Sequence, residues 1–206
     1  MEKQELSKKS KIRIAVFTAL GLIVLLFLFF SLNNVDIPEE FKIARENAAE
    51  ASEEISKILN DSVENLGLIA RYEREENISD ARNLAQEEIN KADARNQAAL
   101  NLATTVQQMA QSAQAIESET AKQKVVEAAS YQVTAITHIL RYNSLLTRLL
   151  QEIEAKLQPR STGTDQRIDE LLAELNEEAE EINILNQNFN QALKEFDSIV
   201  GFHYNS

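Results

Sequence analysis

Cysteine and tryptophan are absent from this chain, and only 4 glycines and 2 prolines occur among its 206 residues. The absence of cysteine excludes disulfides, thiol catalysis, zinc sites built from cysteine and lipid attachment at a cysteine. Because glycine and proline are the residues that most often end helices and form turns, their scarcity indicates few, long elements. Pro38 is suited to the first turn of a helix.

Residues and motifs that commonly carry catalysis are also scarce. The chain has two histidines, His138 and His203, and neither follows a glutamate at the three-residue spacing of a di-iron bundle. The sequence contains no phosphate-binding loop, no dinucleotide motif and no serine–histidine–aspartate arrangement. We therefore expect no catalytic site, no cofactor and no metal ion, and an enzyme is the least favoured class of function.

The net charge of −12 is distributed unevenly along the chain. The basic residues of the N-terminal tail, 1–13, are Lys3, Lys8, Lys9, Lys11 and Arg13. The acidic excess therefore lies after this tail. Nucleic-acid binding requires lysine and arginine to contact phosphates, so we expect no nucleic-acid partner. A solvated acidic surface is the favoured interpretation of the excess, and a cationic protein partner is the alternative.

Residues 14–32, IAVFTALGLIVLLFLFFSL, carry no charge and favour a transmembrane helix. As a helix they span about 28 Å, close to the roughly 30 Å hydrocarbon core of a bilayer. A cleaved signal peptide is the alternative, but the apolar core is long and no small-x-small site follows Phe30. The basic tail predicts a cytoplasmic N-terminus by the positive-inside rule. We expect a single-pass protein of the cell (plasma) membrane whose C-terminal domain is periplasmic or extracellular.

After a linker at 33–38, apolar residues recur at alternating spacings of three and four, the pattern of helices with one buried stripe. The expected helices cover about 39–76, 80–117, 120–157 and 165–200, so that a bundle domain occupies 39–200 and an aromatic tail near the membrane occupies 201–206. The clearest loop is 158–164, QPRSTGT.

Capping residues suggest where these helices begin. Ser79 is a suitable N-cap for the second helix and Asp165 for the fourth. Thr120 with Gln123 matches a capping box, which predicts a tight turn at 118–120. One unbroken helix through this turn is the alternative.

The four expected helices are nearly equal, at roughly 55 Å each. Equal helices joined by short connections are the requirement of an up-down-up-down four-helix bundle. The fold class is therefore all-α: an N-terminal single transmembrane helix followed by an elongated antiparallel four-helix bundle with coiled-coil-like packing.

Four polar residues occupy seam positions at one height of this bundle: Ser62, Arg95, Asn143 and Glu178. We expect a buried polar layer in which Arg95 pairs with Glu178, because an unpaired buried charge costs several kcal/mol. A structural role in fixing the helix register is the favoured interpretation. A ligand-sensing site is one alternative, and outward snorkelling of the side chains is the other.

Two resemblances are carried by short stretches. A basic tail, one anchor and an antiparallel bundle outside the cytoplasm form a layout similar to that of the bacterial LemA family. The ending EEINILNQNFNQALKEFDSIVGF resembles that family's last helix, which is rich in Asn and Phe, whereas the family's signature near the start of its bundle has no match. The stretch ATTVQQMAQSAQAIESETAKQ resembles the helices of chemoreceptor signalling domains, without their hairpin tip. We interpret the second resemblance as shared coiled-coil composition.

The sequence therefore favours a membrane-anchored, non-enzymatic interaction or scaffold module, with a protein partner or self-association. It would act through its outer faces or through the loop around 159–164. The alternative is a sensory bundle that binds a small ligand at the polar layer and signals through a membrane partner.

Overall fold

The computed structural model describes residues 37–158 and 165–201, and within them the chain is helical and contains no strand. The helices are α2 (Glu39–Arg74), α3 (Ile78–Asn90), α4 (Ala92–Ser112), the 3₁₀ helix η1 (Ala113–Ala115), α5 (Glu119–Lys156) and α6 (Asp165–Ile199). The expected tail 1–13, anchor 14–32, most of the linker, the loop residues 159–164 and the aromatic residues 202–206 lie outside the described part. Among the helices that are described, none combines the length and the apolar character needed to cross a bilayer.

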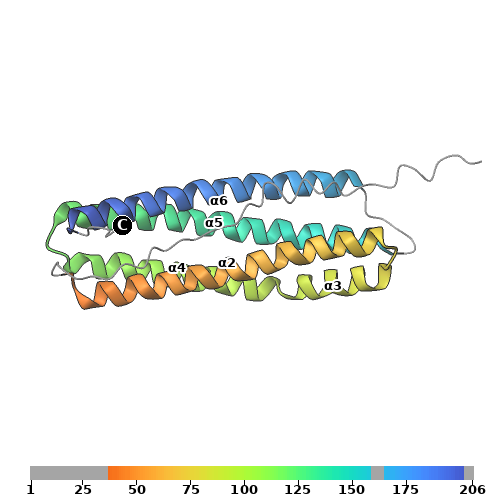
Figure 1. Cartoon of the computed structure of the whole chain (residues 1–206), viewed down its shortest axis with the longest axis horizontal. Helices are drawn as coiled ribbons and strands as arrows, with labels where there is room; N and C mark the ends of the chain where they lie inside the picture. The colour runs from red at the N-terminus through yellow and green to blue at the C-terminus, as the bar shows by residue number, and fades with distance from the viewer. Residues whose placement is uncertain (1–36, 159–164, 202–206) are drawn as a thin grey trace, which may run out of the picture.

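The helices form an elongated bundle in which α3 and α4 follow one another along a single arm (Figure 1). Arg45, near the start of α2, pairs with Asp197, near the end of α6. Lys156, which ends α5, pairs with Glu73 and with Asp165. We call the end marked by Arg45 the near end and the end marked by Lys156 the far end. The helices α2 and α5 therefore run from the near end to the far end, and α6 runs back.

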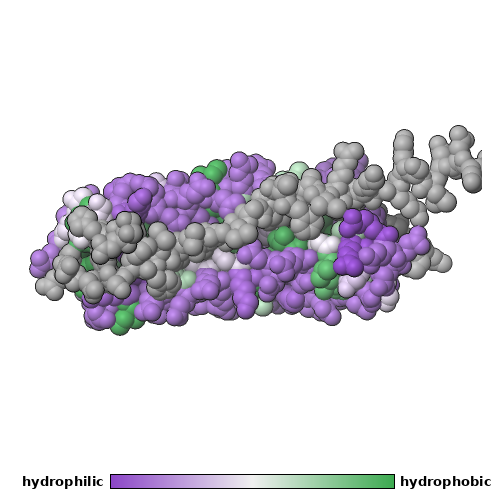
Figure 2. Space-filling model, viewed as in Figure 1, coloured by the Kyte–Doolittle hydropathy of each residue, from purple (hydrophilic) through white to green (hydrophobic). Residues whose placement is uncertain are grey.

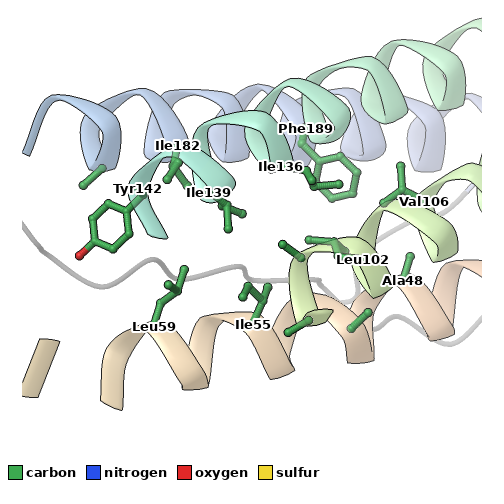
Figure 3. Close-up of a cluster of buried hydrophobic side chains, with 14 of the residues drawn as sticks. Ala48, Ile55, Leu59, Leu102, Val106, Ile136, Ile139, Tyr142, Ile182 and Phe189 are labelled. Atoms are coloured by element: carbon green, nitrogen blue, oxygen red, sulfur yellow. The ribbon is translucent and has the colours of Figure 1, made fainter. Parts of the chain in front are cut away.

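The core is made by apolar side chains that recur at spacings of three and four on every arm, since these positions fall on one face of a helix. Figure 3 shows its middle section, to which all four arms contribute. Its labelled residues are Ala48, Ile55, Leu59, Leu102, Val106, Ile136, Ile139, Tyr142, Ile182 and Phe189. At the near end the rings of Phe41 and Phe196 lie 5.3 Å apart. The surface is mostly hydrophilic, with separate hydrophobic residues (Figure 2).

The turn after α2 explains how that helix ends without glycine. Glu76 has a φ of 61°, in the left-handed region. The backbone N–H of Glu76 donates to the carbonyl of Glu73, and that of Asn77 donates to the carbonyl of Tyr72. These two bonds form a Schellman motif, in which glycine is the usual residue at the left-handed position.

The second arm differs from the single helix expected at 80–117. It is interrupted at Lys91, between α3 and α4, and it ends in the short helix η1. It begins at Ile78, with Asn77 and not Ser79 as the N-cap residue. The next helix begins at Glu119 after an extended segment, and its N-cap is Ser118, whose Oγ accepts from the N–H of Ala121 at 3.3 Å. The chain therefore turns just before 120, and the N-cap lies two residues before the expected Thr120.

Candidate functional site

Arg95 is the centre of a buried polar network in the middle of the bundle. Its side chain is fully buried. Nε donates to Oδ1 of Asn143, and Nη1 donates to Oγ of Ser62 and to Oε2 of Glu88, both at 3.2 Å. Nη2 donates to the backbone carbonyl of Glu88 at 3.1 Å. Every nitrogen of the guanidinium therefore has a partner.

Glu88 is the carboxylate of this network, and it too is fully buried. Its Oε1 accepts from Nδ2 of Asn65 at 2.7 Å and from Nζ of Lys91 at 2.6 Å, while Oε2 accepts from Arg95. Lys91 is half exposed. The carboxylate thus lies between one buried cation and one cation at the surface, so that its charge is balanced from both sides.

The environment keeps both charges of the Arg95–Glu88 pair. Burial alone would raise the pKa of Glu88, but hydrogen bonds from Lys91 and Asn65 and the charge of Lys91 outweigh it and lower this pKa below its usual value. Burial lowers the pKa of Arg95, and the negative charge of Glu88 opposes that effect. Since arginine stays protonated in proteins, the two groups form a buried ion pair at neutral pH.

The network also stabilises the interruption at Lys91. The carbonyl of Glu88 accepts the N–H of Lys91 at 3.2 Å, at a spacing of three, and accepts Nη2 of Arg95 as well. The carbonyl of Ala92 accepts Nδ2 of Asn143 at 3.1 Å. Side chains that bond to helix carbonyls are a recognised cause of breaks in helices. The break and the buried pair are therefore parts of one arrangement.

The structure brings together three of the four residues expected in the polar layer, and it places the fourth elsewhere. Ser62, Arg95 and Asn143 are joined by hydrogen bonds. Glu178 is buried, but its Oε2 lies 2.8 Å from Nδ1 of His138 and its Oε1 lies 3.0 Å from Nε of Arg141. The expected Arg95–Glu178 pair is wrong, because each partner is satisfied by other groups.

Glu88 is the network residue that the sequence reasoning missed. A second arm formed by one continuous helix would place the partner of Arg95 on a facing arm. Glu88 lies about two helical turns before Arg95, on the same apolar stripe. A second charge on the seam of the same arm was the signal that could have identified it.

A second buried polar group lies nearer the near end, and its polar atoms have no partners. Between α5 and α6, Lys124 contacts Glu195 and His138 contacts Glu178. Residues midway between these contacts on the two antiparallel helices lie at one height. Those residues are Gln132 and Asn186, both buried, and neither amide has a hydrogen-bond partner in the described part of the chain.

Of two buried serines on α2, Ser56 lies at about the height of these amides and Ser52 lies one turn nearer the near end. Ser56 comes about three turns after Arg45, and Asn186 comes about three turns before Asp197, which is the residue that Arg45 contacts on α6. Ser56 therefore lies on the flank of α2 that carries Arg45, and Asn186 lies on the flank of α6 that carries Asp197. Ser52, one turn before Ser56, lies on the same face. Both serine hydroxyls are buried without a hydrogen-bond partner in the described residues.

The outer surface of α4 and α5 carries no charge over a long stretch. No Asp, Glu, Lys or Arg occurs between Asn96 and Ile116, and none occurs at 128–137. The exposed residues there, together with Val126 just before the second stretch, form a surface that we call the uncharged face: Leu100, Thr104, Gln107 and Gln111 of α4, and Val126, Ser130, Val133 and Thr137 of α5. Its charged border is at Val126, which is next to Glu127 and one turn after Lys122. By contrast, the exposed side of α2 at similar height carries Glu46, Glu50, Glu53 and Glu54.

The two halves of the uncharged face belong to neighbouring flanks. Asn96 of α4 bonds to Asn143 of α5, so it marks the flank of α4 that faces α5, and Leu100 follows it one turn later. On α5, Lys124 contacts α6, and Val126 comes two positions later, on the opposite flank. The face is therefore continuous across the α4–α5 pair.

Comparisons with protein families, curated proteins and solved structures found no match. In the described residues, no three His, Cys, Asp or Glu side chains are grouped so that they could hold a metal ion.

Proposed function

We propose that this protein is a non-enzymatic interaction module, anchored by residues 14–32 and displayed outside the cytoplasm, that binds another protein through the uncharged face. The main support for this proposal is the contrast in charge between the uncharged face and the acidic remainder of the chain. Leu100 and Val133 are 50% and 52% exposed within the two uncharged stretches, and Val126, at the border beside Glu127, is 49% exposed. Exposed aliphatic side chains without nearby charge are typical of surfaces that become buried in a protein complex.

The threonines of the face add to its apolar character. The hydroxyl of Thr104 donates to the carbonyl of Leu100 at 3.0 Å, and that of Thr137 donates to the carbonyl of Val133 at 3.2 Å. Because these hydroxyl protons are used within their own helices, burying the threonines leaves no donor unpaired. A partner can therefore cover this part of the surface at low desolvation cost.

Site-specific photo-cross-linking in native membranes tests this proposal. A photoreactive amino acid is placed at Leu100 or Val133, and at Ile43 of α2 as the control, because Ile43 is 51% exposed beside acidic residues. We expect covalent protein adducts at the first two positions and few at Ile43. Equal yields at all three positions, or none at Leu100 and Val133, would contradict the proposal.

The anchor and its direction need a separate test. Since the chain has no cysteine, a single introduced cysteine reports on one position only. An impermeant maleimide added to intact cells should label the variant Ile43→Cys, whereas Ser7→Cys should react only after permeabilisation. The reverse pattern, or recovery of the protein in the soluble fraction, would contradict a cytoplasmic N-terminus followed by an external bundle.

A small-ligand sensor is the second candidate function, and the buried polar group around Gln132 and Asn186 favours it. The network at Arg95 offers a ligand nothing to bind, since its guanidinium and carboxylate are fully engaged. In contrast, Ser52, Ser56, Gln132 and Asn186 carry buried donors and acceptors without partners, and none of them is charged. A small neutral ligand with both donors and acceptors, such as a polyol or a primary amide, is the class that would match them.

Thermal unfolding distinguishes this candidate from the interaction module. A ligand that binds only the native protein raises its melting temperature as the ligand concentration increases. A polyol or amide that acts at this site should raise the melting temperature of the wild type and not that of Asn186→Leu. An equal rise in both proteins would exclude the site.

A further inference from the structure

The uncharged face fits one partner in particular, a second copy of this chain. Along the exposed side of α5, Val126, Ser130, Val133 and Thr137 follow one another at spacings of four, three and four. This is the spacing of the contact positions of a coiled coil. The core side of α5 has its own stripe at the same spacing, so α5 carries a second helix-packing stripe that faces outward.

The charge of the molecule limits what can approach this stripe. Two copies, each with a net charge of −12, repel one another wherever their acidic surfaces meet. Over 128–137 the stripe brings no like charges together when it meets its own copy, and the charges that border it at Val126 have opposite signs, Lys122 and Glu127. Its amide side chains, Gln107 and Gln111, both donate and accept hydrogen bonds, so the face is complementary to itself. These are the requirements of a two-fold interface, in which the same patch serves both subunits.

We propose that two copies associate side by side, with the stripe of Val126, Ser130, Val133 and Thr137 on α5 of one copy against the same stripe of the other, in parallel. The parallel direction rests on the proposed function, because an anchor at the same end of both copies aligns them. Small side chains at Ser130 and Thr137 let the two helices approach closely, and the valines on either side fill the contact.

Disulfide cross-linking of single-cysteine variants in native membranes tests this arrangement. The 206-residue chain provides a background free of native cysteine. A parallel pair with a two-fold axis along the helices brings each stripe residue opposite its own copy, within the roughly 4 Å between Cβ atoms that a disulfide needs. Both Val126→Cys and Val133→Cys should therefore form dimers on mild oxidation. The matched controls are Ile43→Cys on α2 and Ile184→Cys on α6, which are similarly exposed and should stay monomeric.

Three results of the disulfide cross-linking would contradict the parallel dimer. Dimers at Val133 and not at Val126 would indicate an antiparallel contact and overturn the parallel arrangement. Dimers that form as fast at Ile43 or Ile184 as at Val133 would show random collision or a different face. No dimer at either valine would overturn self-association outright.

A charge placed in the stripe gives an independent measurement. For the 206-residue chain in dilute lipid vesicles, Val133→Glu should weaken dimerisation by roughly tenfold or more, whereas Ile43→Glu should leave it unchanged. An equal effect of both substitutions would overturn the proposal. The photo-cross-linker at Val133 separates this inference from the proposed function. An adduct with a different protein would refute self-association and preserve the interaction role, while no protein adduct would refute both.

Discussion

Replacing Glu88 by glutamine removes the charge that balances Arg95 and keeps the size of the side chain. Both residues are fully buried, so water cannot compensate for the lost charge. Breaking a buried pair from one side costs about 3–5 kcal/mol. The amide oxygen of the glutamine can still accept from Asn65, which places the expected loss near the lower end, at about 3 kcal/mol. For a domain whose total stability is about 5–15 kcal/mol, this loss is large.

Urea unfolding of the 206-residue chain in micelles, followed by circular dichroism, measures this loss. A double-mutant cycle then identifies the partner of Arg95. Arg95→Met combined with Glu88→Gln should cost less than the sum of the single changes, with a coupling of at least about 1.5 kcal/mol. The matched control is Arg95→Met combined with Glu178→Gln. Because Glu178 is satisfied by His138 and Arg141, these two changes should add to within about 0.5 kcal/mol.

Two results would refute this reasoning. A loss below about 1 kcal/mol for Glu88→Gln would mean that Arg95 does not depend on its negative charge. Coupling of Arg95 with Glu178, together with additivity with Glu88, would restore the pairing expected from the sequence and would place the second arm in another register.

Three further predictions concern stability. The pKa of Glu88 is lowered on folding, so its contribution is complete above the unfolded value of about 4.3 and is lost as the pH falls through the lower folded value. Acid titration of the urea midpoint should therefore be steeper in the wild type than in Glu88→Gln, and identical slopes would contradict the linkage. Glu76→Gly should stabilise the protein by about 1 kcal/mol, because glycine tolerates the φ of 61°, whereas Glu75→Gly, at a φ of −81°, should bring no gain. Tyr142→Phe should be neutral or stabilising by thermal unfolding, since its buried hydroxyl has no hydrogen-bond partner in the described part of the chain; a loss above about 1 kcal/mol would show that the hydroxyl is bonded.

The periodicity of apolar residues was sufficient to predict much of this fold. Apolar residues at spacings of three and four form a stripe along one side of a helix, and such a stripe is buried by packing against other helices. The same counting placed Arg95, Ser62 and Asn143 at one height, where the structure joins them. It failed at Lys91, since neither glycine nor proline marks the break. What holds the break is the bonding of Arg95 to the carbonyl of Glu88 and of Asn143 to the carbonyl of Ala92. The first contact lies within the same arm, whereas the second comes from α5, and a pattern read along one helix cannot contain it.

The two buried polar groups of this bundle differ in a way that bears on function. The group at Arg95 is charged, spans several helices and is satisfied, which makes it a device that fixes which helices meet and in what register. The group that includes Gln132 and Asn186 is neutral and unsatisfied, and buried amides without partners destabilise a protein. Replacing Asn186 by leucine should therefore stabilise the free protein, whereas Asn143→Leu should destabilise it, because Asn143 accepts from Arg95. If the free energy of unfolding rises for Asn186→Leu and falls for Asn143→Leu, the two layers have different roles. The layer at Arg95 then specifies the fold, and the polarity of the layer at Asn186 serves something other than stability.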